Sequence, residues 1–186
     1  MANPRPSTQA MTTRDDASWI ERALERHEAA LVAYAARITG DVEAARDVVQ
    51  ETYLKLCRAR REAVEPQLAE WLFTVCRNAA VDLRRKRGRA AEDEEFEMAE
   101  IEGSTGFAPA AEVERRDESA RAITLLASLP GKQREVLRLR FESGLSYKEI
   151  ARVTGQSIGN VGWLIHMGLK SLRAQLAGDA VEGTVQ

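Results

Sequence analysis

The sequence is poor in the features that define several protein classes. Of its 186 residues, 2 are cysteine and 5% are aromatic. Cys57 and Cys76 stand alone, with neither CxxC spacing nor histidines placed to share a metal ion, so no metal site is predicted. Both lie on or near the apolar face of a predicted helix. We therefore expect two buried, reduced thiols.

Membrane and catalytic signatures are missing as well. No apolar run approaches the ~20 residues that cross a bilayer, and the first residues lack the apolar core of a signal peptide. We therefore expect a cytoplasmic protein without membrane insertion. No nucleophile stands beside a base, no carboxylates are paired in an apolar setting, and no phosphate-binding loop is present. The sequence predicts a protein that is not an enzyme and needs no cofactor.

What the sequence does contain favours an all-α fold. Hydrophobic residues make up 44% of the chain and charged residues 30%. Runs of β-branched residues are few, and the strict alternation typical of a half-buried strand is absent. The length allows one large or two small domains.

The charge is unevenly distributed, although the net charge is only -2. Residues 17–90 carry 14 basic and 11 acidic side chains, and residues 119–177 carry 9 and 3. Residues 91–118 between them carry 2 and 11. Because a basic domain attracts polyanions, each flanking segment is a candidate for nucleic-acid binding. The acidic segment could shield one of them when nucleic acid is absent.

These patterns predict two small helical domains joined by a flexible acidic linker. The predicted parts are a disordered lead-in (1–16), a first domain (17–89), the linker (90–110), a second domain (111–177) and a polar tail (178–186).

The first domain is predicted to contain three amphipathic helices, over 17–38, 41–58 and 66–87, with a loop over 59–66. Asp41 is the expected N-cap of the second. The polar face of this second helix, taken alone, is that of a solvated helix. The third helix ends in five basic side chains within six residues, more than a helix end requires. With Arg77 and Asn78 upstream they form a cationic ridge for a phosphate backbone, with an amide able to read a base.

The second domain carries the pattern of a helix-turn-helix within residues 129–176. Ser146 and Glu149 form a capping box, Ala151 lets two helices cross closely, and Gly155 takes the turn between them. Helices over 111–126 and 131–141 are expected to support the motif, the latter with Val136, Leu137 and Phe141 inward.

The second helix of the motif has an apolar and a polar side. The residues expected to be buried are Ile158, Val161, Leu164, Ile165, Gly168 and Leu172. Those expected to face outward, toward base edges or phosphates, are Ser157, Asn160, Trp163, His166, Met167 and Lys170. A helical hairpin in an ordinary bundle would show the same apolar periodicity and is the alternative.

Three segments resemble the extracytoplasmic-function (ECF) sigma factors, the small members of the sigma-70 family of bacterial RNA polymerase initiation subunits. DVEAARDVVQETYLKLCR (41–58) resembles region 2.2 of the family, and EWLFTVCRNAAVDLRRKRGR (70–89) resembles regions 2.3 to 2.4. LPGKQREVLRLRFESGLSYKEIARVTGQSIGNV (129–161) resembles region 4. The resemblance covers residues 17–89 and 111–176, with the motifs in the order of the family.

The resemblance implies that the partners are core RNA polymerase (the β′ and β subunits), promoter DNA and an anti-sigma factor. The residues implied to bind core polymerase are Asp41, Asp47, Gln50, Glu51 and Leu54. Those implied to bind the minus 10 element, with Asn78 contacting an extruded base, are Arg77, Asn78, Asp82, Arg84, Arg85, Lys86 and Arg87. Those implied to bind the minus 35 element are Tyr147, Lys148, Ser157, Asn160, Trp163, His166 and Lys170.

The stretch after Val161 departs from the family, which usually continues with a polar, basic run. Here Gly162, Trp163, Leu164 and Met167 leave few cations, so we expect minus 35 binding that is weaker and less sensitive to salt. Trp163 and Met167 either cover the helix edge or form a docking patch for a thymine methyl group or a regulatory protein.

Two other functions fit parts of the pattern. A transcriptional regulator would bind duplex DNA by itself, usually as a dimer, but the sequence offers no dimerisation helix or sensor pocket. A helical adaptor would meet only proteins, with the basic ridges as solvated surface. Binding to core polymerase before any stable DNA binding would exclude the regulator, and salt-dependent binding to single-stranded minus 10 DNA would exclude the adaptor.

Overall fold

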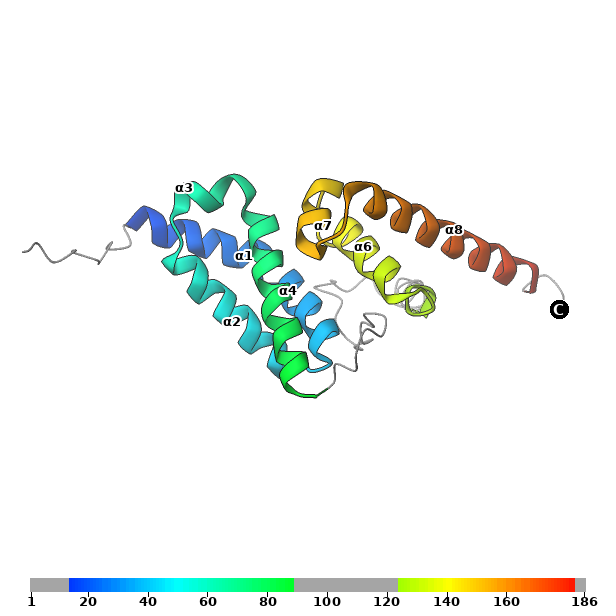
Figure 1. Cartoon of the computed structure of the whole chain (residues 1–186), viewed down its shortest axis with the longest axis horizontal. Coiled ribbons are helices and arrows are strands. Elements are labelled where there is room, and N and C mark those ends of the chain that lie inside the picture. The colour runs from blue at the N-terminus through cyan, green and yellow to red at the C-terminus, as the bar shows by residue number, and fades with distance from the viewer. Residues whose placement is uncertain (1–13, 89–123, 183–186) are drawn as a thin grey trace, which may run out of the picture.

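The computed structural model describes residues 14–88 and 124–182, and both parts are helical (Figure 1). The first part contains α1 (Arg14–Thr39), α2 (Val42–Arg58), α3 (Arg61–Val64), a 3-10 turn (Glu65–Gln67) and α4 (Leu68–Lys86). The second contains α6 (Gly131–Phe141), α7 (Tyr147–Thr154) and α8 (Ile158–Glu182), preceded by a helical turn at residues 124–127. The predicted all-α fold class is confirmed. The linker, residues 1–13 of the predicted lead-in and most of the 111–126 helix lie outside the described residues. The lead-in was drawn too long, because residues 14–16 form the first turn of α1.

The core of the first bundle is formed by one apolar stripe from each of α1, α2 and α4. Leu31, Leu56 and Leu72 are at most 1% exposed, and Phe73 packs beside the Tyr34 ring with centroids 5.5 Å apart. Burial of several large side chains from each helix is the main term that holds such a bundle together. The opposite helix faces are left to solvent and to partners.

The predicted N-cap of α2 is confirmed. Oδ1 of Asp41 accepts hydrogen bonds from the backbone N–H groups of Glu43 at 2.9 Å and Ala44 at 3.4 Å. Two of the donors that a helix start leaves unpaired are thereby satisfied.

The prediction of a loop over 59–66 is wrong, because residues 61–64 form α3 and residues 65–67 form the 3-10 turn. Arg61 donates two hydrogen bonds of 3.0 Å to Glu65, four residues later in the chain. The side chain of Val64, which lies between the two in sequence, is buried. An i,i+4 ion pair and one buried apolar side chain favour a helical turn here. Pro66 falls at the start of the 3-10 turn, where its missing N–H costs nothing.

The helix-turn-helix of the second bundle is confirmed. The Ser146 hydroxyl accepts from the N–H of Glu149 at 3.3 Å, while the Glu149 carboxylate accepts from the N–H of Ser146 at 2.6 Å. Gly155 has a φ of 71°, the left-handed conformation that ends α7. Gly168 allows close packing of α8 on α6, because a Cβ there would lie 2.7 Å from Leu137 Cδ1.

Four details of the sequence analysis are wrong. Ile158 is 53% exposed, because as the first residue of α8 it precedes the point where the helix meets the core. Phe141, expected inward, is 65% exposed at the last turn of α6. Cys57 is exposed at the end of α2, whereas Cys76 is buried as expected. The backbone of α8 continues to Glu182, past the end expected at Ala177.

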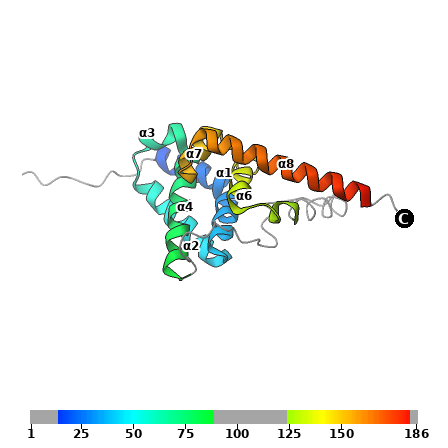
Figure 2. The same cartoon turned by 45° about the vertical axis from the view of Figure 1, so that its right-hand side comes forward.

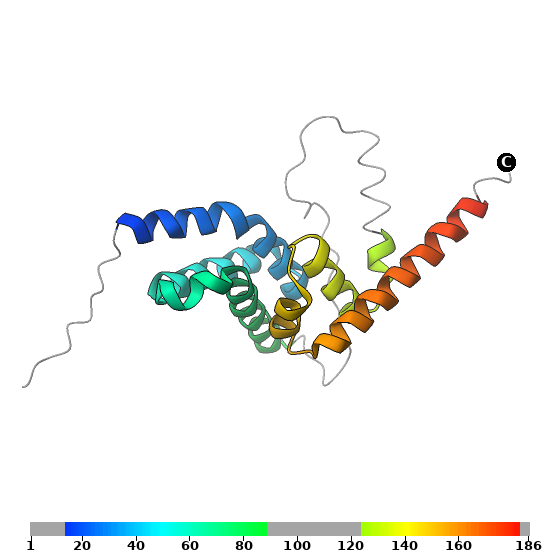
Figure 3. The same cartoon turned by 90° about the horizontal axis from the view of Figure 1, so that it is seen from above.

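The two bundles contact each other through α4 and α7. The views in Figures 1 and 2 both place α7 beside α4, and Figure 3 shows α8 running away from the first bundle toward the C-terminus. Within the two described ranges, none of the helices combines the length and apolar character needed to cross a membrane.

We predict that Gly155→Ala destabilises the protein by about 1–2 kcal/mol, because a residue with a Cβ pays that cost in the left-handed conformation. Thermal or denaturant unfolding followed by circular dichroism measures the change. Gly159→Ala is the matched control, since Gly159 lies in the first turn of α8 with nothing within 4 Å of the added Cβ. It should leave stability unchanged or raise it by about 0.4–1 kcal/mol, and equal losses in both variants would contradict the prediction.

Candidate functional site

The exposed face of α2 forms a ridge between two grooves. The ridge carries four of the five residues that the resemblance assigns to core polymerase, namely Asp47, Gln50, Glu51 and Leu54. Gln50 and Leu54 line a largely apolar groove of about 440 Å³ between α1 and α2. Asp47 and Glu51 line a more polar groove of about 420 Å³ between α2 and α4. Leu54 is 50% exposed, and an exposed leucine beside an apolar groove is suited to a protein partner.

Asp41, the fifth of these residues, lies at the opposite end of α2 from Leu54. The backbone N–H groups of Ala44 and Glu43 lower the pKa of its carboxyl, and the Arg87 guanidinium, 3.4 Å away, adds to the effect. Asp41 therefore has a structural role at the helix start. Its ion pair with Arg87 also connects the start of α2 to the basic end of α4.

The α4 side of the polar groove gathers most of the residues assigned to the minus 10 element. Asn78, Asp82 and Lys86 follow one another at intervals of four residues and so share one face of the helix. With Arg87 they line the groove opposite Asp47 and Glu51. Arg85 is exposed and Arg84 half-buried in the same last turn. An amide and a cluster of cations thus share one open surface.

Arg77 is separated from this surface, although it directly precedes Asn78. Its side chain is 19% exposed, and its Nε donates a hydrogen bond of 2.9 Å to Oε1 of Glu135 in α6. The Tyr34 hydroxyl donates to the same oxygen at 2.7 Å. Burial alone would lower the pKa of Arg77, but Glu135 and Tyr34 together outweigh it and the pKa is raised. Burial, reinforced by Glu135, also raises the pKa of Tyr34.

The residues assigned to the minus 35 element lie on α7, on the turn after it and on the first half of α8. Tyr147 and Trp163 are 41% and 56% exposed. Tyr147 packs over Gly162, where an added Cβ would lie 3.8 Å from the ring, and Arg140 stands 5.6 Å from the ring centroid. The remaining exposed members are Lys148, Ser157, His166 and Lys170.

Ser157 and Asn160 also have local roles at the start of α8. The Ser157 hydroxyl accepts from the N–H of Asn160 at 3.1 Å, and the Asn160 amide donates to Gln156 at 2.5 Å. Asn160 is half-buried, and Met167 is partly covered as well. The most exposed large apolar side chain on this face is therefore Trp163, at 56%.

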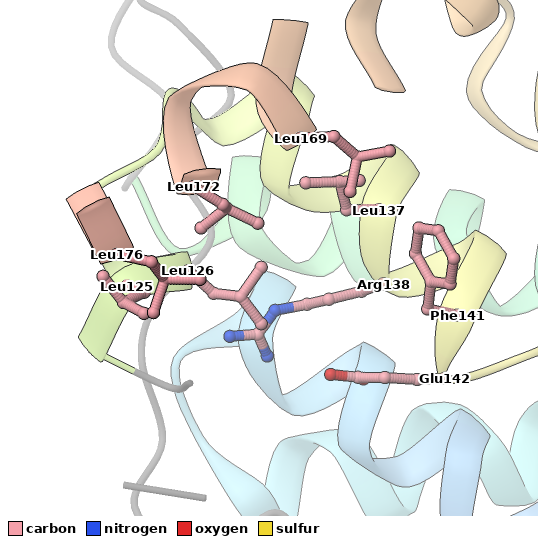
Figure 4. Close-up of a pocket in the computed structure, with 9 residues that line it drawn as sticks. All are labelled: Leu125, Leu126, Leu137, Arg138, Phe141, Glu142, Leu169, Leu172 and Leu176. Carbon is pink, nitrogen blue, oxygen red and sulfur yellow. The ribbon is translucent and has the colours of Figure 1, made fainter. Parts of the chain in front are cut away.

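A third groove, of about 260 Å³, lies between α6 and α8 (Figure 4). Its lining consists of six leucines and Phe141, together with the charged residues Arg138 and Glu142. Leu176 is 51% exposed beside it. This surface was not predicted from the sequence, because Phe141 was expected to lie in the core.

The polar contacts between the bundles were not predicted from the sequence either. Arg37 in α1 pairs with Glu142 at 2.9 Å, and Arg152 in α7 pairs with Glu70 in α4 at 2.7 Å. Periodicity assigned these charged residues no role, and their pairing spans 82 or more residues of sequence.

The described thiols are not arranged for metal binding, since the residues of the two described ranges contain no group of three or more His, Cys, Asp or Glu able to hold an ion. Burial raises the pKa of the Cys76 thiol to about 12. The pKa of His27 is lowered by burial and by Arg26.

Comparison with known proteins places this geometry in a family. Residues 23–90 match the Sigma-70 region 2 family, and residues 119–172 match Sigma-70, region 4. The chain is similar to the ECF RNA polymerase sigma factor SigL of Mycobacterium tuberculosis, with 31% identity over 170 residues, covering 87% of this chain and 90% of SigL. The chain belongs to the ECF sigma factors of the sigma-70 family, which are not enzymes.

Two solved structures share the fold. One is CnrH in complex with the cytosolic domain of CnrY, at 27% identity and a TM-score of 0.54, covering 88% of this chain and 90% of CnrH. The other is the sigma factor RpoE of Bartonella quintana in complex with the anti-sigma factor NepR, at 25% identity and a TM-score of 0.57, covering 89% and 98%.

Proposed function

We propose that the protein binds core RNA polymerase, directs it to promoters through minus 10 and minus 35 elements, and helps to melt the DNA. The observation that carries this proposal is the shared surface of α2 and α4. One groove there joins Asp47 and Glu51, assigned to polymerase, with Asn78, assigned to an extruded base. A single bundle can therefore hold polymerase and single-stranded DNA at adjacent places.

The minus 10 surface combines two functions that promoter melting needs. Cations hold the phosphate backbone without regard to sequence, whereas an amide can hydrogen-bond a base edge and so read sequence. The last turn of α4 supplies the cations, and Asn78 supplies the amide two turns earlier. Capture of an unpaired base by this surface stabilises the separated strands.

The minus 35 surface is the exposed face of α7 and α8. A helix-turn-helix places its second helix in the major groove with the N-terminal residues at the base edges. Lys148, His166 and Lys170 would meet phosphates, and Trp163 is positioned for an apolar contact with a thymine methyl group. Local hydrogen bonds of Ser157 and Asn160 fix the start of this helix.

The third proposed partner is an anti-sigma factor. The similar sigma factor RpoE was solved with the anti-sigma factor NepR. The apolar groove between α6 and α8 is a surface on which an amphipathic helix of such a partner could dock (Figure 4). It is lined by side chains other than those assigned to DNA.

We predict that Leu54→Glu weakens binding to core polymerase at least about tenfold, because it places a charge where an apolar anchor would be buried. Co-purification with core enzyme and start-site selection in a reconstituted reaction provide the measurement. Ala63→Glu adds the same charge to an exposed position of α3 and should bind normally. If the unmodified chain neither binds core enzyme nor selects start sites, the proposed function is wrong.

We predict that Asn78→Ala costs about 1–3 kcal/mol of discrimination at one minus 10 position, because a base-edge contact is lost. Transcription from a library of minus 10 sequences resolves the position. Arg84→Ala is the contrasting variant and should weaken all sequences roughly alike, since it removes a backbone contact. A uniform effect of Asn78→Ala would show that this amide does not read a base.

We predict that Trp163 contacts a thymine methyl group of the minus 35 element. Replacing each minus 35 thymine by deoxyuridine removes only that methyl group and should lower the affinity of the unmodified holoenzyme by about 0.8 kcal/mol. Trp163→Ala should lower affinity for the thymine promoter and make the holoenzyme indifferent to the replacement. If both proteins respond equally to deoxyuridine, Trp163 merely covers the helix edge.

A further inference from the structure

Three large apolar side chains are exposed around the start of α8. Ile158, the first residue of the helix, is 53% exposed, Trp163 is 56% exposed, and Tyr147 of α7 is 41% exposed. The resemblance assigns Trp163 and Tyr147 to the minus 35 element, but it assigns no role to Ile158. A cluster of exposed apolar side chains of this kind marks a contact surface.

Ile158 and Trp163 flank a strip of bare backbone in the first two turns of α8. Successive residues of a helix are turned by about 100°, so Trp163 leaves α8 about 140° around the axis from Ile158. Gly162 and Gly159 fall between them, at about 40° and about 100°. Among the described residues, a Cβ at Gly159 would meet nothing within 4 Å, and one at Gly162 would lie 3.8 Å from the Tyr147 ring. Two apolar side chains therefore project on either side of a helix surface that a ligand can approach closely.

The charge around this cluster is that of a surface for a polyanion. Residues 143–177 carry 4 basic side chains and 1 acidic one. The acidic one, Glu149, is engaged in the capping box of α7, where its carboxylate accepts from the N–H of Ser146. Arg140 lies 5.6 Å from the centroid of the Tyr147 ring and adds a cation at the edge of the cluster. The ligand is therefore an anion that also presents apolar groups, and DNA presents them as the C5-methyl groups in its major groove.

The position of Ile158 in the helix-turn-helix directs it to the base edges. In this motif the N-terminal residues of the second helix are those that reach the bases. Ile158 and Trp163 are five residues apart, a rise of about 7.5 Å along α8, which equals about two base-pair steps of about 3.4 Å. The two side chains therefore meet different base pairs. Because an aliphatic side chain has no donor or acceptor, a methyl group is the feature of a base edge that Ile158 can recognise.

We infer that Ile158 is a specificity residue for the minus 35 element and recognises a C5-methyl group about two base pairs from the one contacted by Trp163. This inference rests on the proposed function and extends it to a residue that the resemblance does not assign. Thymine and 5-methylcytosine carry this methyl group at the same place on the base. A contact that reads the methyl group alone accepts both bases and disfavours uracil and cytosine.

The test first removes single methyl groups from the DNA. The unmodified holoenzyme selects its minus 35 element from a promoter library that is random at those positions, and each thymine of the selected element, on either strand, is then replaced singly by deoxyuridine. Titration of fluorescently labelled promoter duplex measures binding. We expect two thymines at which loss of the methyl group weakens binding about fourfold, the effect of burying one such group. The response at one of them should disappear in Trp163→Ala, and the response at the other should disappear in Ile158→Ala.

A second set of duplexes tests whether the methyl group is sufficient. At the thymine assigned to Ile158, the base pair is changed to cytosine–guanine or to 5-methylcytosine–guanine. The unmodified holoenzyme should bind the methylated pair about fourfold more tightly, and Ile158→Ala should bind both pairs equally. Val42→Ala is the matched control, because Val42 is the exposed first residue of α2, in the first bundle, and it should respond to every duplex like the unmodified protein.

The inference is wrong if Ile158→Ala, shown to be folded by circular dichroism, responds to every deoxyuridine like the unmodified protein. It is also wrong if the unmodified holoenzyme binds the cytosine and 5-methylcytosine duplexes equally. Start-site selection by the unmodified chain with core polymerase is measured in parallel. If that reaction fails, the proposed function fails. If it succeeds while Ile158→Ala keeps every response to deoxyuridine, only the inference about Ile158 is wrong.

Discussion

The constraint on which the structure depends is the narrowness of the apolar stripe on each helix. α1, α2 and α4 each bury one side against the others, and Leu31, Leu56 and Leu72 are buried members of the resulting core. Each helix therefore retains a polar side that the core does not use. On α2 and α4 these sides lie next to each other, so the packing that stabilises the bundle also brings the residues proposed to bind polymerase beside those proposed to bind DNA.

The helices of the helix-turn-helix also pack through narrow apolar stripes, with a small residue at the closest contact. Gly168 lets α8 approach α6 so closely that Leu137 fills the space of a side chain. Val161, Leu164 and Ile165 are then buried, while Trp163 and His166 on the same turns remain outside. Trp163 faces outward and Leu164 inward because of their positions on the helix, although both side chains are apolar.

Local patterns predicted the parts of the structure that local interactions determine. The Asp41 cap, the Ser146 capping box and the left-handed Gly155 each depend on residues within four positions, and all three were predicted. The α3 turn was missed because residues 59–66 interrupt the apolar periodicity and end at Pro66, whereas the Arg61 and Glu65 pair favours a helical turn. Phe141 and Ile158 were wrongly predicted to be buried. They are the last residue of α6 and the first residue of α8, and a periodic pattern does not show where a helix leaves the core.

The contacts between the bundles could not be predicted from local sequence patterns. Glu135 stands among buried residues of α6, and a glutamate in that setting gives no indication of which cation it will meet across 58 residues of sequence. The assigned minus 10 residues illustrate the difference. Asn78, Asp82 and Lys86, which the resemblance assigned to the minus 10 element, share one face of α4, whereas Arg77 of the same set meets a partner in the other bundle.

The separation of Arg77 from the other cations has an electrostatic consequence. Exposed cations such as Arg85 and Lys86 are screened by salt over a Debye length of about 8 Å, so their attraction for DNA falls steeply as ionic strength rises. The pair between Arg77 and Glu135 is largely buried and is screened much less. Raising the salt concentration therefore weakens the attraction of DNA more than the attraction that keeps the bundles together.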